Sequence, residues 1–158
     1  MFERKNKAAP SGDKDKAYDA ALSFLDARDH GEKELFDKLT RRFTPEAARS
    51  AVYRLKENGL VDDERYAREY ARRLFERKRL ARRGIVAKLR ARGITGEVAS
   101  AAAQELDFDE DEAARELAEE LLEPGASQKE KQRVVRRLTS LGYSTGSIIR
   151  AINAVEEE

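Results

Sequence analysis

The stretch that decides the fold is residues 60–94, LVDDERYAREYARRLFERKRLARRGIVAKLRARGI. On a helix of 3.6 residues per turn, its first apolar residues share one face: Tyr66, Ala67, Tyr70, Ala71, Leu74 and Phe75. The opposite face carries arginines: Arg65, Arg68, Arg72 and Arg79. The stretch therefore predicts an amphipathic helix with a core face and a cationic face.

The positive charge of this stretch exceeds what an ordinary solvated helix carries. Residues 65–92 contain twelve Arg or Lys and two acids. Like charges three and four residues apart repel by a few tenths of a kcal/mol each. We therefore expect a contact surface for a polyanion or an acidic protein. Residues 105–123 hold ten acids and one base, so this segment could neutralise the surface in the fold.

The pattern of helices repeats along the chain. An apolar trio recurs at a spacing of about 49 residues: Leu35, Phe36 and Leu39; Ile85, Val86 and Leu89; Val134, Val135 and Leu138. No segment alternates with the period of a strand. The sequence predicts an all-α fold, a tandem array of three three-helix repeats that is elongated and curved. We expect a disordered tail at 1–16 and repeats at 17–60, 61–107 and 108–158.

Several helix starts are recognised by their capping residues. The first three are Gly31 with Glu34, Asp62 or Asp63, and Asp109 with Glu112; Ser127 with Glu130 has the full capping-box pattern. A further start combines a Thr cap, Thr44, with Pro45 at the first helical position.

The composition argues against enzymatic chemistry. Of 158 residues none is cysteine and one is histidine, so no N/S metal site can be assembled. The sequence has no glycine-rich phosphate loop and no nucleophile elbow. We expect no enzyme activity, no cofactor and no metal. The sequence also lacks an apolar run long enough for a membrane span and a signal-peptide core, which predicts a cytoplasmic protein without membrane contact.

Two groups of residues form distinctive motifs. The first is Leu25-x-x-Arg28-x-x-Gly31-x-x-Glu34-Leu35-x-x-Lys38-Leu39. The second is the run Gly59–Ala67, GLVDDERYA, followed by Tyr70 and by Lys88-Leu89-x-x-x-Gly93-Ile94. Together they resemble the signatures of the RecX family of bacterial recombination regulators, and the resemblance covers about residues 17–155. It departs from the family at Gly84, where a basic residue usually precedes the isoleucine.

This resemblance implies a modulator of RecA. Proteins similar to this one lie along the filament of RecA on single-stranded DNA and inhibit its recombinase, ATPase and co-protease activities in DNA repair and the SOS response. The partners implied are the RecA filament and, weakly, single- or double-stranded DNA, with the protein acting as a monomer. A helical nucleic-acid-binding protein that acts on DNA without RecA is the alternative. A third interpretation is an adaptor for an acidic protein.

Charge and helical phase select the residues expected to form the contact surface. In the middle repeat these are Arg65, Arg68, Arg72, Arg79, Arg82, Arg83, Lys88, Arg90 and Arg92. In the third repeat they are Lys131, Arg133, Arg136 and Arg137. Arg73, Arg77 and Lys78 flank the apolar stripe, and we expect their stems to lie along it.

Overall fold

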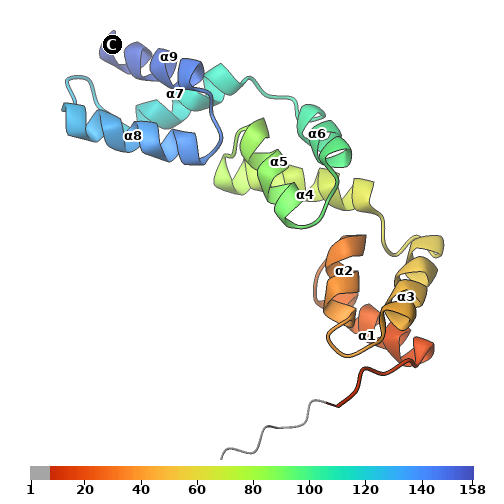
Figure 1. Cartoon of the computed structure of the whole chain (residues 1–158). Helices are drawn as coiled ribbons and strands as arrows, with labels where there is room; N and C mark the ends of the chain where they lie inside the picture. The colour runs from red at the N-terminus through yellow and green to blue at the C-terminus, as the bar shows by residue number, and fades with distance from the viewer. Residues whose placement is uncertain (1–7) are drawn as a thin grey trace, which may run out of the picture. The chain divides into compact units, whose positions relative to one another are not determined.

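The computed structural model describes residues 8–158, and within them the fold is all-α (Figure 1). The helices are α1 Lys14–Ala27, α2 Glu32–Leu39, α3 Pro45–Glu57, α4 Asp63–Lys78, α5 Arg82–Ala91, α6 Gly96–Gln104, α7 Glu110–Leu121, α8 Gln128–Ser140 and α9 Thr145–Glu156. The only β pairing in this part of the chain is an isolated bridge between Ser11 and Phe43. The prediction of an all-α fold is confirmed.

Two compact units make up the chain, Met1–Tyr66 and Ala67–Glu158. The first contains α1, α2, α3 and the first turn of α4, and the second contains the remainder of α4 and all later helices. The second and third predicted repeats thus lie in one unit. The division into three repeats follows the order of the helices but stays a prediction.

The core of the first unit is built from small and aliphatic side chains. Leu35, Leu39 and Leu55 are almost completely buried, and alanines such as Ala47 and Ala51 let the helices approach closely. Burial of such side chains provides the main driving force for packing.

The first helix begins earlier than predicted. α1 begins at Lys14 because the side chain of Asp13 accepts hydrogen bonds from the amides of Asp15 and Lys16. Ser11 is held as well: its amide donates to the carbonyl of Arg42 at 2.9 Å. The expected disordered tail is therefore wrong for residues 11–16, and residues 1–7 of that prediction lie outside the described residues.

Adjacent aspartates cap two different helices of this unit. Asp62 Oδ1 accepts from the amide of Arg65 at 3.1 Å and caps α4. Asp63 Oδ1 accepts from the amide of Glu32 at 2.8 Å and caps α2. Gly31, the residue expected to begin a capping box, supplies no side-chain hydrogen bond. α2 begins after Gly31 as the sequence predicts, and because glycine has no side chain to cap the helix, Asp63, far away in the sequence, accepts the hydrogen bond from the first amide.

The later helix starts follow the sequence more closely. Ser127 and Glu130 form the predicted capping box, with each side chain bonded to the backbone amide of the other residue. Asp109 accepts from the amide of Glu112 at 3.0 Å and caps α7. These local signals were sufficient because both partners lie within one turn of helix.

Within the second unit, α5 is joined to the turn between α8 and α9. The amide of Ala81 donates to the carbonyl of Leu141 at 3.0 Å. Gly84 lies so close that a Cβ there would be 2.3 Å from the same carbonyl oxygen. The start of α5 and the end of α8 therefore meet through their backbones.

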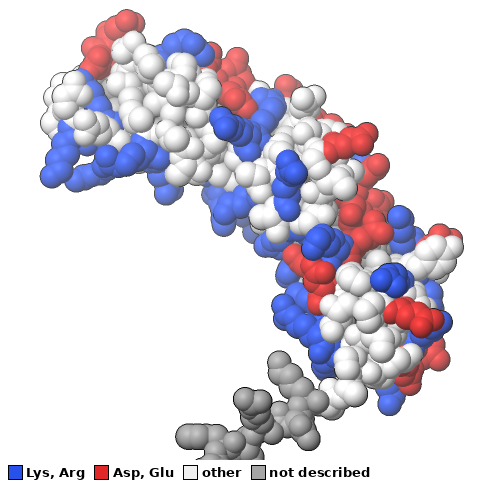
Figure 2. Space-filling model, in the orientation of Figure 1, with Lys and Arg blue, Asp and Glu red and all other residues white. Residues whose placement is uncertain are grey.

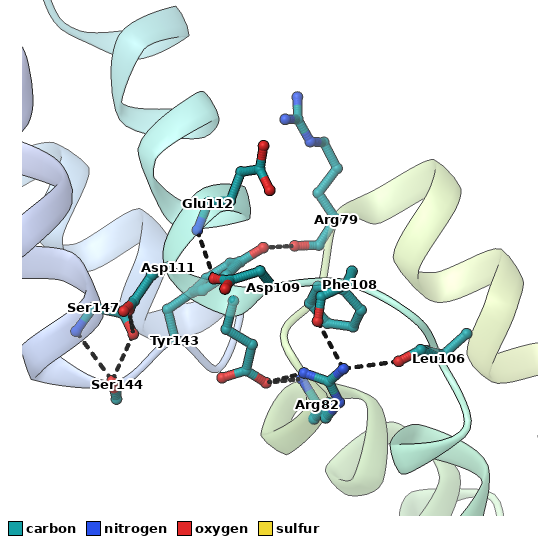
Figure 3. Close-up of polar contacts among 11 residues, drawn as sticks. Arg79, Arg82, Leu106, Phe108, Asp109, Asp111, Glu112, Tyr143, Ser144 and Ser147 are labelled. Carbon is teal, nitrogen blue, oxygen red and sulfur yellow. Dashed lines mark hydrogen bonds and ion pairs between the residues drawn. The ribbon is translucent and has the colours of Figure 1, made fainter.

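A polar cluster ties α7 to α9. Asp111 Oδ1 accepts from the hydroxyl of Ser147 at 2.6 Å (Figure 3). It also accepts from Arg150 Nη2 at 2.9 Å. These two hydrogen bonds lower the pKa of Asp111, the bond from Arg150 having the larger effect. The pair with Arg150 is exposed to solvent and contributes little to stability.

Among residues 8–158, no helix is both long and apolar enough to cross a lipid bilayer.

Candidate partner-binding surface

The predicted contact residues fall on α4, α5 and α8 and on the connections that precede and follow α5. On the face drawn in Figure 2, Lys and Arg side chains lie in several places, with Asp and Glu side chains among them. Arg65 belongs to the first unit, and the other predicted contact residues belong to the second. These residues differ in the contacts that each makes.

Five of these basic side chains remain available. They are exposed and have no ion pair among the described residues: Arg68, Arg72, Arg83, Lys88 and Arg90. On α4, the residues behind them are buried, since Ala67, Ala71 and Leu74 have 0–2% of their surface exposed. The helix is thus amphipathic in the sense predicted, with arginines on the solvent side.

Arg82 is used inside the molecule. Its Nη2 donates to the carbonyls of Leu106 and Phe108, each at 2.8 Å, in the connection between α6 and α7 (Figure 3). Its guanidinium lies 4.1 Å from the centre of the Phe108 ring, close enough for a cation–π interaction. Glu110 Oε1 accepts from the backbone amide of Arg82 at 3.0 Å and so caps α5. These contacts give Arg82 a structural role that the charge pattern did not reveal.

Arg79 is also bound within the second unit, by carboxylates of the acidic helix α7. Its two terminal nitrogens bind Glu120 Oε1 at 2.7 Å and Glu116 Oε2 at 3.4 Å on α7. Its backbone has a positive φ of 58°, which is unusual for a residue with a side chain. The side chains of Arg79 and Arg82 are therefore both engaged within the second unit.

Tyr143 is a residue of this region that the sequence did not single out. Its hydroxyl donates to the carbonyl of Arg79 at 2.8 Å (Figure 3). Burial raises the pKa of Tyr143 to about 12, while the charge of Arg79 acts in the opposite direction. This hydrogen bond supports the backbone of Arg79 in its uncommon conformation. Nothing local in the sequence pairs residues 79 and 143.

Three other predicted residues each contact another group of the chain. Arg65 donates to the carbonyl of Gly59 from Nη1 and Nη2, at 3.2 and 3.3 Å. The guanidinium of Arg92 lies 4.8 Å from the centre of the Tyr70 ring. Lys131 forms an ion pair with Glu156 at the end of α9.

The remaining predicted residues lie on α8. Arg133, Arg136 and Arg137 are exposed and have no ion pair within residues 8–158. Together with Leu121, Glu130 and Val134 they line a groove of about 640 Å³. The charges of α8 are therefore combined with an apolar surface, in contrast to the arginines of α4.

The acidic helix α7 thus neutralises only part of the basic block. Glu110, Glu116 and Glu120 engage Arg82 and Arg79 and leave Arg68 and Arg72 of α4 without an ion pair among residues 8–158. In the part of the chain that the structure describes, no group of three or more His, Asp or Glu side chains is placed to hold a metal ion.

Comparisons with known proteins agree with this helical organisation. The family model described as the first three-helix domain of RecX matches residues 17–55, and that for the second matches residues 62–102. Regulatory protein RecX from Streptomyces lividans is 30% identical over 162 residues, which cover 98% of this chain and 86% of that protein. Regulatory protein RecX from Mycobacterium sp. strain JLS is 34% identical, with 82% of this chain and 76% of that protein covered.

A solved structure shows the same fold. The crystal structure of RecX from Lactobacillus salivarius superposes with a TM-score of 0.76 at 22% identity, and covers 92% of this chain and 97% of that one.

Proposed function

Because the chain belongs to the RecX family, we propose that it regulates the RecA recombinase by binding the filament that RecA forms on single-stranded DNA. It acts by binding rather than by catalysis, and it lowers the ATPase, co-protease and strand-exchange activities of the filament. Its curated relatives are named regulatory proteins, which supports a role in regulation. The proposal places the protein in the cytoplasm as a monomer that acts in DNA repair and the SOS response.

The observation that carries the proposal is a set of exposed basic side chains on α4 and α5 that form no ion pair among residues 8–158. Arg68 and Arg72 are four residues apart on α4, so they lie one above the other on its solvent face. Arg83, Lys88 and Arg90 add exposed charge on α5. Keeping like charges adjacent on a helix is unfavourable unless a partner compensates them. A nucleoprotein filament offers both phosphates and protein carboxylates for this purpose.

The test is charge reversal of the two arginines on α4. We expect the double variant Arg68→Glu, Arg72→Glu to lose at least about tenfold in apparent affinity for RecA on single-stranded DNA, a change of about 1.4 kcal/mol. Inhibition of the RecA ATPase is the primary measurement. The melting temperature and helix content should stay close to those of the unchanged protein, because both side chains are exposed.

A matched control is available on the same helix. The variant Arg77→Glu, Lys78→Glu makes the same change in net charge at exposed positions in the last turn of α4. Arg77 lies about half a turn around the helix from Arg68. We expect this control to keep most of its inhibition. Equal loss in both variants would mean that only overall charge matters, and no loss in the first would remove the α4 face from the contact surface.

A comparison of binding to three forms of DNA distinguishes regulation of RecA from direct action on DNA without RecA. Binding is measured to bare single-stranded DNA, to duplex DNA and to single-stranded DNA coated with RecA. The proposal requires clear preference for the coated strand. Equal or tighter binding to bare DNA would favour a plain nucleic-acid-binding protein.

A further inference from the structure

Helices α7 and α8 form a groove that shares no residue with the basic surface of α4 and α5. It lies where the end of α7 meets α8 and has a volume of about 640 Å³. Its lining residues are Leu121 from α7 and Glu130, Arg133, Val134, Arg136 and Arg137 from α8. Both helices are labelled in Figure 1, where α8 is drawn in blue.

The groove has an apolar base. Leu121 is 49% exposed, whereas the next residue, Leu122, is 5% exposed and belongs to the core. Val134 is buried beneath the groove and packs α8 onto its neighbours. The aliphatic stems of the flanking arginines extend this surface. No other part of residues 8–158 covers the exposed side of Leu121.

The rim of the groove is positively charged. Arg133, Arg136 and Arg137 are exposed and have no ion pair among the described residues. The one acid of the lining, Glu130, is already bound, since its Oε2 accepts from the amide of Ser127 at 2.7 Å. The carboxylate thus completes the cap of α8 and its charge offsets part of that of Arg133, so the lining, with three arginines and one acid, keeps a net positive charge.

An apolar base under an arginine rim suits an acidic protein segment better than a nucleic acid. Single-stranded nucleic acids bind where aromatic side chains stack on their bases, and this groove is lined by no aromatic residue. An amphipathic helix instead places apolar side chains in a groove and its charged residues at the rim. Arginine forks bind carboxylates in bidentate geometry.

We propose that the groove between the end of α7 and α8 binds an acidic amphipathic segment of a protein partner. An apolar side chain of that segment packs on Leu121, and its carboxylates bind Arg133, Arg136 and Arg137. The inference rests on the proposed function for the expectation that the partner is a protein of the filament. The chemistry of the groove is tested without the filament, so the two proposals can fail separately.

The first experiment measures binding of the full chain to three labelled probes by fluorescence anisotropy. One probe is a synthetic acidic helical peptide with leucines at positions i, i+4 and i+7. The second is a polyglutamate peptide of the same net charge, and the third is an oligothymidylate of the same charge. We expect the leucine-bearing peptide to bind at least about tenfold more tightly than either of the other two. Equal or tighter binding of the oligothymidylate, or no binding of the leucine-bearing peptide, would overturn the proposal.

The second experiment assigns the binding to the groove. Leu121→Ala and Arg133→Glu should each weaken peptide binding by about tenfold. Lys129→Glu is the control, since Lys129 is an exposed residue of α8 that does not line the groove. Circular dichroism and the melting temperature show that each variant is folded. A loss from Lys129→Glu as large as that from Arg133→Glu would indicate general charge attraction and contradict the assignment.

The double variant Arg68→Glu, Arg72→Glu separates the groove from the proposed function. It should bind the peptide as tightly as the unchanged protein does, while it loses affinity for the RecA filament. Loss of peptide binding in this variant would place the peptide on α4 and overturn the groove as its site.

Discussion

Gly84 occupies a position where no side chain fits. A Cβ would lie 2.3 Å from the carbonyl oxygen of Leu141 and 3.0 Å from its carbonyl carbon, and both atoms belong to the backbone. The same carbonyl accepts the amide of Ala81 at 3.0 Å, which holds the two segments together. A side chain at this position would therefore require α5 and the turn after α8 to move apart.

This contact makes a prediction about glycine substitutions. Gly84→Ala should reduce the free energy of unfolding by about 1–3 kcal/mol, because the methyl group forces the two backbones apart. Gly96→Ala is the matched control. Its Cβ would meet only the guanidinium of Arg90, at 3.8 Å, so we expect no loss or a gain of about 0.4–1 kcal/mol. Urea unfolding of both variants is the measurement, and equal stabilities would show that the contact at Gly84 relaxes freely.

Arginines with the same sequence context have different roles. Arg68 is exposed and unpaired within residues 8–158, whereas Arg82 binds two carbonyls and stacks on Phe108. Both are basic residues of a basic helix. Charge and helical phase select the two equally, and only the position of the connection between α6 and α7 distinguishes them.

At the scale of the elements, the two aspartates before α4 show how a helix end is shared. Asp62 serves the helix that it precedes, as its place in the sequence indicates. Asp63 serves α2, which precedes it by about 30 residues, because the start of α4 lies against the start of α2. Burial is the main cause of the raised pKa of Asp63, and the hydrogen bond from Glu32 opposes that shift.

The caps predict different local effects of two neighbouring substitutions. Asp63→Ala should destabilise the protein by about 0.5–2 kcal/mol and accelerate amide exchange at the first turn of α2. Asp62→Ala should have a similar cost but accelerate exchange at the first turn of α4. Hydrogen exchange followed by NMR resolves the two. Exchange that accelerates only in α4 for both variants would contradict the assignment of Asp63 to α2.

For the whole molecule, the net charge of +1 conceals a division between paired and unpaired charges. Ion pairs such as Arg79 with Glu120 and Arg115 with Glu119 neutralise part of each sign. Arg68 and Arg72 of α4 and the arginine rim of α8 have no ion pair within residues 8–158 and are left to interact with partners. Association with a polyanion therefore depends on local surfaces and is expected to be screened by salt.

The salt dependence of binding to bare single-stranded DNA provides a quantitative prediction. Each phosphate contact contributes about −0.7 to the slope of log K against log salt. If Arg68 and Arg72 both contact phosphate, as we expect, the variant Arg68→Ala, Arg72→Ala should reduce the magnitude of the slope by about 1.4. Titrations at several salt concentrations measure it. An unchanged slope would mean that these arginines do not contact the phosphates of the bare strand.

The sequence by itself determined the helices and their caps wherever both partners lie within one turn. The amphipathic pattern of α4 and the capping box of Ser127 and Glu130 are such cases, because neighbouring residues on a helix are close in space whatever the rest of the chain does. The same pattern predicted that a cationic face would be exposed, and Arg68 and Arg72 are exposed.

Only the tertiary structure decided which charges are satisfied internally. Arg79 and Arg82 meet the carboxylates of α7 and the carbonyls before it, and Tyr143 meets the carbonyl of Arg79, across separations of 24–64 residues. The groove on α8 likewise depends on where the end of α7 lies. Such contacts depend on the distance between atoms, which the spacing of residues along the chain does not specify once it exceeds a single element of secondary structure.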